Sequence, residues 1–125
     1  MGDGKILENG PILVVSADAG LRKSLAFVLA AEGFATIDFA DLASARAASV
    51  LAACRCAIVD EVAPGNAGDL DILPPAMPMI VLCDRVTSRP KGLLRYVAKP
   101  ILGPKLTMLV HRLLDEAGHA ANGTK

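Results

Sequence analysis

The chain has 125 residues and a formal net charge of zero, from thirteen basic and thirteen acidic side chains, and no cluster of Lys and Arg marks a nucleic-acid surface. Its 53% hydrophobic content excludes a disordered chain, and its length suits one domain with a core of its own. Apolar runs end within about ten residues, short of the roughly 20 that a membrane span needs. Three cysteines are too few for a disulfide scaffold, so the composition predicts a small cytoplasmic globular protein.

Short apolar runs alternate with longer amphipathic stretches along the chain. Five runs are typical of strands, at 11–16, 34–39, 56–60, 79–83 and 94–98. Helical spacing of apolar residues predicts a first helix, capped by Asp18 and ended by Gly33. We expect a second, alanine-rich helix from Asp41 to about Ala53, and a terminal helix that begins near Pro104. Alternating strands and helices favour a parallel sheet covered on both faces.

Proline and glycine interrupt two later intervals. Between residues 64 and 78, only about 67–73 can form a helix, and the twelve residues between Cys83 and Tyr96 contain Pro90. We therefore expect a third helix that is a short stub and a fourth that is a stub or a loop. The expected organisation is a flexible lead-in, one domain and a flexible tail, at residues 1–10, 11–117 and 118–125.

Two motifs near predicted strand ends contain the candidate site residues: Asp60-x-x-x-Pro64-x-x-x-Gly68 and Tyr96-x-x-Lys99-Pro100. Together with the first strand they resemble the receiver domain of bacterial two-component response regulators, over about residues 11–117. The resemblance implies a single-domain α/β fold with a flavodoxin-like, doubly wound, parallel five-stranded sheet. It implies that Asp60 accepts a phosphoryl group within a loop shaped by Pro64 and Gly68. It also implies a cis peptide bond between Lys99 and Pro100, which brings the Lys99 ammonium to Asp60.

The pair of acidic residues that receivers carry at the end of the first strand is replaced here by Ser16-Ala17. Mg²⁺ typically takes one or two protein carboxylates along with waters, and phosphoryl transfer needs that cation. The formal charge of the pocket changes from about −3 to −1, so we expect weak Mg²⁺ binding at most and no other cofactor. Asp18 is not expected to replace the lost ligands, because that needs an insertion and Asp18 can already cap the helix.

Two further positions correspond to the residues that switch on activation of a receiver. Cys83 stands where receivers carry Thr or Ser, and a thiol is a weak donor, so we expect Cys83 to signal poorly. A buried, inert cysteine is favoured there over a redox sensor, because no activating base is evident. Tyr96 matches the aromatic that changes rotamer, and a plain half-buried strand residue is an equal alternative. Cys54 and Cys56 have no second cluster to complete a metal site.

The function that we favour is a divergent receiver acting as a protein–protein signalling module in a phosphorelay, with weak or absent Mg²⁺-dependent phosphorylation. It is not an enzyme beyond self-phosphorylation and dephosphorylation at Asp60. The alternative is a working receiver phosphorylated on Asp60 by a histidine kinase. A third reading, a flavodoxin-like binder of small molecules, is disfavoured because Ser16–Gly20 makes a poor phosphate loop.

The expected partner is a histidine kinase or another signalling protein, with no nucleic acid and no membrane. A homodimer is also compatible with the sequence. We expect a partner to bind on the first and terminal helices. No output domain follows the predicted domain within these 125 residues. Output is therefore expected to pass through a partner, unless the chain is a fragment of a longer protein.

Overall fold

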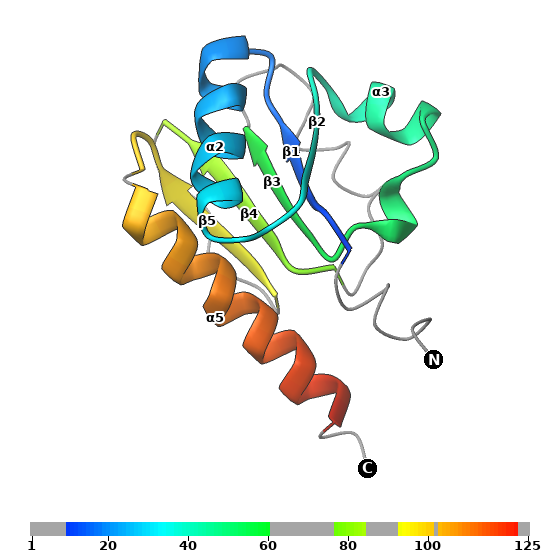
Figure 1. Cartoon of the computed structure of the whole chain (residues 1–125), viewed down its shortest axis with the longest axis vertical. Helices are drawn as coiled ribbons and strands as arrows, with labels where there is room; N and C mark the ends of the chain where they lie inside the picture. Colours follow the sequence, from blue (N-terminus) through cyan, green and yellow to red (C-terminus); the bar gives the residue numbers. More distant parts are fainter. Residues whose placement is uncertain (1–9, 61–76, 85–92, 102, 123–125) are drawn as a thin grey trace.

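The structure is a computed structural model of the chain, and it describes residues 10–60, 77–84, 93–101 and 103–122 (Figure 1). Strands and helices alternate along these residues, as the sequence pattern predicts. The elements in chain order are β1 (Ile12–Val15), α2 (Ala19–Ala31), β2 (Thr36–Phe39), α3 (Leu42–Ala47), the 3₁₀ turn η1 (Leu51–Ala53), β3 (Cys56–Asp60), β4 (Met79–Cys83), β5 (Leu94–Ala98) and α5 (Gly103–Asn122). No helix among the described residues is long and apolar enough to cross a membrane.

The five strands form one sheet in the order β2-β1-β3-β4-β5, and every neighbouring pair is parallel. All residues of β1, β3 and β4 are buried, which explains their uninterrupted apolar sequences. The chain adds β2 on one side of β1 and then crosses over to add β3 on the other side, so β1 and β3 flank the switch point of the sheet. The predicted doubly wound, parallel five-stranded sheet is confirmed.

Helices cover both faces of the sheet, as Figure 1 shows, with α2 and α5 side by side on one face and α3 toward the other. Alternate residues of β1, β3 and β4 enter different cores. Ile12 and Val14 pack with Leu25, Leu29 and the apolar stripe of α5. On the opposite face, residues 13 and 15 of β1 pack with the buried side chains of α3. The sheet is thereby fixed between two layers, and the ends of its strands are held in place.

The helix caps expected from the sequence are present. Asp18 precedes α2, and its Oδ1 accepts a hydrogen bond from the Leu21 N–H at 3.1 Å. Asp41 caps α3 in the same way, accepting from the Ser44 N–H at 2.7 Å. Gly33, with φ of 94°, lies in the left-handed region just after α2, where glycine is favoured.

One predicted helix is shorter than expected. The helix from Asp41 was expected to reach about Ala53, but α3 ends at Ala47. Ser49 adopts a φ of 60°, and its N–H donates to the Arg46 carbonyl at 3.0 Å, which closes the helix. Only Leu42 and Ala45 of α3 are buried, so alanine propensity without a longer apolar stripe did not extend it.

Two other expectations meet the limits of the described residues. The segments expected to form a short third helix and a short or absent fourth helix lie mostly at 61–76 and 85–92, outside the described residues. At the carboxyl end, α5 runs to Asn122 and so extends into the stretch 118–125 that was expected to be a loose tail. The division into lead-in, domain and tail remains a prediction.

Candidate functional site

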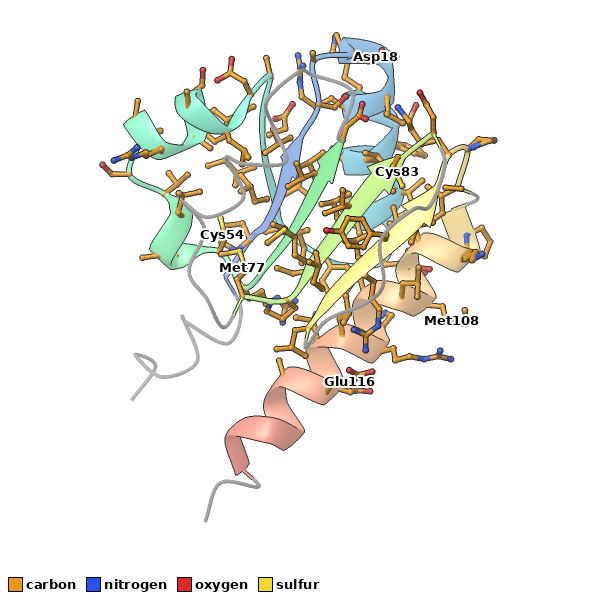
Figure 2. All side chains as sticks on the ribbon, turned by 180° about the vertical axis from the view of Figure 1, so that it is seen from behind. Asp18, Cys54, Met77, Cys83, Met108 and Glu116 are labelled. Atoms are coloured by element: carbon orange, nitrogen blue, oxygen red, sulfur yellow. The ribbon has the colours of Figure 1, made fainter. Side chains whose placement is uncertain are left out.

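Four strand ends meet at the carboxyl edge of the sheet. Ser16 follows β1, Asp60 ends β3, Cys83 ends β4 and Lys99 follows β5. The register pairs Val15 with Val59 and the last residue of β3 with Leu82, so these ends lie level with one another. Figure 2 shows Cys83 at the same end of the sheet as the start of α2. Parallel strands therefore bring these polar side chains to the place where such sheets usually bind ligands.

Asp60 is the centre of this group. Its side chain is only 2% exposed, and each of its carboxylate oxygens accepts a hydrogen bond. Oδ2 accepts from the Ser16 hydroxyl at 2.9 Å, and Oδ1 accepts from the Lys99 ammonium at 2.9 Å. A buried carboxylate is costly without hydrogen bonds and an opposite charge, and these two residues supply both.

Lys99 is fixed by its backbone as well as by its ammonium. The Lys99 N–H donates to the Cys83 carbonyl at 2.8 Å, which extends the pairing of β5 with β4 by one residue. The peptide bond between Lys99 and Pro100 is cis, as the resemblance implied. The Lys99 side chain is 20% exposed, and its Nζ also lies 3.7 Å from Oδ1 of the exposed Asp84. The ammonium therefore bridges a buried carboxylate and a solvated one.

Ser16 is held on both of its polar groups. Its Oγ accepts a hydrogen bond from the Asp18 N–H at 3.1 Å while its hydroxyl faces Asp60. Its carbonyl accepts from Nη1 of Arg22 at 2.7 Å, and Nε of Arg22 donates to Asp38 at 3.0 Å. The backbone of Ser16 is thereby linked to α2 and β2, while its side chain is held by Asp60 and by the Asp18 N–H.

The positions of the lost acidic pair offer little to a cation. Ala17 is exposed and its side chain has no ligand atom, and Ser16 offers a single side-chain hydroxyl that already donates to Asp60. Asp18 caps α2, as expected, and does not supply a second carboxylate to Asp60. Within the described residues, no three side chains from His, Cys, Asp and Glu gather in a way that could hold a metal ion. The described part of this pocket therefore offers a cation the carboxylate of Asp60, whose two oxygens already accept hydrogen bonds, and weak Mg²⁺ binding remains a prediction.

Of the two candidate switch residues, Cys83 lies at the site, where its carbonyl accepts from the Lys99 N–H, and Tyr96 lies earlier on β5. Cys83 is buried, and its Sγ donates to the Val97 carbonyl at 3.6 Å. Tyr96 is half-buried and packs against the core on the α3 face, beside Val81, its register partner in β4. Their signalling roles remain predictions. The expected loop residues Pro64 and Gly68 lie outside the described residues.

The other two cysteines are buried on opposite faces of the sheet, so they form no common ligand pair. Cys54 belongs to the core on the α3 face and Cys56 to the core beneath α2 and α5. Burial raises the pKa of the Cys54 thiol, and it raises the pKa of Cys56 to about 12. Both thiols are therefore protonated near neutral pH and poorly reactive.

Sequence reasoning missed three parts of this site. It treated Ser16 only as a lost ligand, although a hydroxyl at a strand end beside a predicted carboxylate is a signal for a hydrogen bond. It did not consider Arg22, which lies one helical turn after Asp18 and so returns to the end of β1. It also passed over Asp84, which directly follows the last residue of β4.

Comparisons with known proteins identify the fold. No protein-family model and no curated protein sequence matches the chain. The solved receiver domain of the hybrid histidine kinase CckA is 23% identical, covers 84% of this chain and 99% of its own, and has a TM-score of 0.71. A CheY-like receiver domain protein from Methanospirillum hungatei JF-1 is 19% identical over 89% of this chain and 98% of its own, with a TM-score of 0.71.

A larger protein shares the same fold in part of its length. NtrX from Brucella abortus, solved in complex with ADP, is 23% identical over 90% of this chain, with a TM-score of 0.74, and the match spans 28% of NtrX. At these identities the likeness establishes architecture. This chain has the fold of a response regulator receiver domain.

Proposed function

We propose that this chain is a divergent receiver domain that signals by binding a partner protein, with Mg²⁺-dependent phosphorylation of Asp60 weak or absent. The observation that carries the proposal is the closed arrangement around Asp60. Its carboxylate oxygens accept from Lys99 and from Ser16, each at 2.9 Å. Receiver domains are solved both as separate chains and inside larger proteins, and their fold alone does not select a chemistry.

Charge is the first argument for weak phosphorylation. A phosphoryl group carries negative charge, and its transfer depends on cations that offset that charge. The described pocket contributes one ammonium, and that ammonium is already paired with Asp60 and near Asp84. A divalent cation would enter a site whose buried carboxylate is already neutralised. The Coulomb energy that the cation gains from the Asp60 carboxylate would therefore be small.

Access is the second argument. A nucleophilic carboxylate needs a free oxygen that can approach phosphorus in line. Oδ2 of Asp60 lies under the Ser16 hydroxyl, and the Asp60 side chain is 2% exposed. Attack through Oδ2 would weaken the hydrogen bond from Ser16, and attack through Oδ1 would weaken the ion pair with Lys99, because the attacking oxygen gives up negative charge to phosphorus. Each loss adds to the barrier.

The second candidate function is a working receiver that a histidine kinase phosphorylates on Asp60. One observation favours it: Lys99 is in contact with Asp60, where it could stabilise charge on an acyl phosphate. A partner would then have to open the pocket or supply what Ser16 and Ala17 lack. Both candidates place the protein in two-component signalling and differ in whether Asp60 changes covalently.

Restoring the acidic pair separates the two candidates. The wild type and a Ser16→Asp/Ala17→Asp variant are incubated with acetyl phosphate and Mg²⁺, and intact mass spectrometry follows the addition of one phosphoryl group. An Asp60→Asn change in each background identifies the modified residue. We expect little modification of the wild type and clear modification of the restored variant, lost with Asp60→Asn. Equal phosphorylation of the wild type and the restored variant would instead establish the working receiver.

A further inference from the structure

Arg22, in the first part of α2, joins the end of β1 to β2. Its Nη1 donates to the Ser16 carbonyl at 2.7 Å, and its Nε donates to Oδ2 of Asp38 at 3.0 Å. The side chain is only 19% exposed, although arginine is mostly exposed in folded proteins. The donors of a guanidinium form a rigid planar fork, so contacts with two partners at once fix those partners relative to each other.

Ser16 is held through its backbone on the side that faces β2. Its N–H donates to the Phe39 carbonyl at 3.1 Å, and its own carbonyl accepts from Arg22. β2 ends at Phe39, and the guanidinium supplies a donor to β1 just beyond that point. Because Ser16 is 1% exposed, losing this donor would leave a buried carbonyl short of a hydrogen bond.

The side chain of Ser16 reaches in the other direction, since β3 lies on the opposite side of β1 from β2. Its hydroxyl donates to Oδ2 of Asp60 at 2.9 Å, and its Oγ accepts from the Asp18 N–H at 3.1 Å. A hydrogen bond is lost once donor and acceptor are more than about 3.5 Å apart, so a shift of about 1 Å at the end of β1 is enough to break the contact with Asp60. The contact therefore depends on a fixed backbone at Ser16.

We propose that Arg22 is a positioning residue of the Asp60 pocket: anchored on Asp38, it fixes the backbone of Ser16 so that the hydroxyl stays on Oδ2 of Asp60. The proposal rests on the proposed function, because it concerns how the same closed pocket is maintained. The contacts run from Asp38 through Arg22 and Ser16 to Asp60. A change at Asp38, whose side chain is 44% exposed, should therefore reach a carboxylate that is 2% exposed.

The alternative is that the pair of Arg22 and Asp38 only stabilises the fold. A partly exposed ion pair contributes little to stability, and its loss would then lower the free energy of unfolding without changing the surroundings of Asp60. The two roles differ in what happens at the Asp60 carboxylate, so the measurement has to be made on that group.

The carboxyl ¹³C chemical shift of Asp60, measured by NMR at neutral pH, reports the hydrogen bonds to this carboxylate. Ser16→Ala defines the shift without the Ser16 hydroxyl. We expect Arg22→Met to move the Asp60 signal at least about halfway toward the Ser16→Ala value, and to cause no further change in the Ser16→Ala background, because the two residues act through one contact. Lys23→Met is the matched control: it removes a positive charge from the next, exposed position of α2 and should leave the signal unchanged.

Asp38→Ala separates positioning from a long-range effect of charge. It removes a negative charge and Arg22→Met removes a positive one, so a charge effect would move the Asp60 signal in opposite directions. Loss of positioning moves the signal in the same direction in both variants. Circular dichroism establishes that the variants are folded. Since Asp38 lies half exposed on an edge strand, its variant carries the test even if Arg22→Met does not fold.

An Asp60 signal that keeps its wild-type position in the folded variants would overturn the proposal. Shifts of opposite sign in Arg22→Met and Asp38→Ala would do the same, as would an equal shift in Lys23→Met. These outcomes are separate from the acetyl phosphate experiment, in which equal modification of the wild type and the restored variant overturns the proposed function whatever Arg22 does.

Discussion

Ser16 donates its hydroxyl to Oδ2 of Asp60 at 2.9 Å, across 44 residues of sequence. The two residues lie at the ends of the adjacent strands β1 and β3, so the contact follows from the sheet. In this position Ser16 supplies a hydrogen bond where the resemblance implies a carboxylate that binds a metal ion. The polar group at the end of β1 therefore stabilises the buried Asp60 without a cation.

Removing that hydroxyl should destabilise the fold. Ser16→Ala leaves one oxygen of a buried carboxylate without this donor, and we expect the free energy of unfolding to fall by about 1–2 kcal/mol. Urea denaturation followed by circular dichroism measures the change. Ser24→Ala, at an exposed position of α2, is the matched control and should stay within about 0.5 kcal/mol of the wild type. Equal effects of the two substitutions would mean that the Ser16 contact contributes nothing.

Removing the Lys99 ammonium should lower the free energy of unfolding more than removing the Ser16 hydroxyl does. Lys99→Met takes away the opposite charge beside a carboxylate that is 2% exposed, and we expect a loss of about 2 kcal/mol. The value lies below that of a fully buried pair because Lys99 is 20% exposed. Lys105→Met, at an exposed position of α5, controls for the loss of a positive charge.

A double variant tests whether the loss of stability in Lys99→Met comes from leaving the Asp60 carboxylate buried without its opposite charge. Asp60→Asn/Lys99→Met removes both charges together, so it should be more stable than Lys99→Met alone. If the double variant is instead the less stable of the two, the carboxylate is not the source of the penalty.

Asp41, the N-cap of α3, makes a pH-dependent contribution to the stability of the fold. Hydrogen bonds from Ser44 lower the pKa of Asp41 from 3.8, so its stabilisation is complete above pH 3.8 and is lost as the pH falls through the folded-state value. We expect the stability difference between the wild type and Asp41→Ala to shrink as the pH is lowered to about 3. Asp41→Asn caps without titrating, so its difference from Asp41→Ala should not change with pH. Urea titrations at each pH provide the free energies, and a gap that grows in acid would refute this assignment.

The buried thiols should be protected in the native protein. Burial raises the pKa of Cys56 to about 12, so its reactive thiolate forms only as the pH rises toward that value. Alkylation at about pH 8, read by peptide mass spectrometry, should therefore be slow at Cys56 in the native protein and fast in denaturant. Cys54, whose pKa burial also raises, should behave alike. Native labelling of Cys56 at the rate seen in denaturant would contradict its position in the core.

Strands were the most predictable elements. Buried parallel strands are short and largely apolar, so 56–60 and 79–83 have the same limits in the sequence and in the structure, and the half-buried edge strand 94–98 keeps its limits as well. The limits of α3 were not predictable in this way. Alanine favours a helix almost anywhere, and the left-handed turn at Ser49 has no glycine to announce it.

The site was predictable in its residues and less so in its contacts. Strand ends placed Asp60 at the carboxyl edge of the sheet, and the family resemblance implied that Lys99 would reach it; the structure places the two side chains 2.9 Å apart. The Arg22 contact to the Ser16 carbonyl depends on the angle at which α2 leaves the sheet, and that angle comes from tertiary packing. No local sequence pattern encodes it.

The most direct test of the central claim is a titration of the protein with Mg²⁺, followed by the amide chemical shifts of residues 15–18, 58–60 and 83–84. If the Asp60 carboxylate is already satisfied by Ser16 and Lys99, these shifts should change little, with no saturation below about 1 mM Mg²⁺. The Ser16→Asp/Ala17→Asp variant, titrated in parallel, should show saturable shifts at lower concentrations. Saturable shifts below about 1 mM in the wild type would contradict the account, because they require cation ligands beyond those around Asp60.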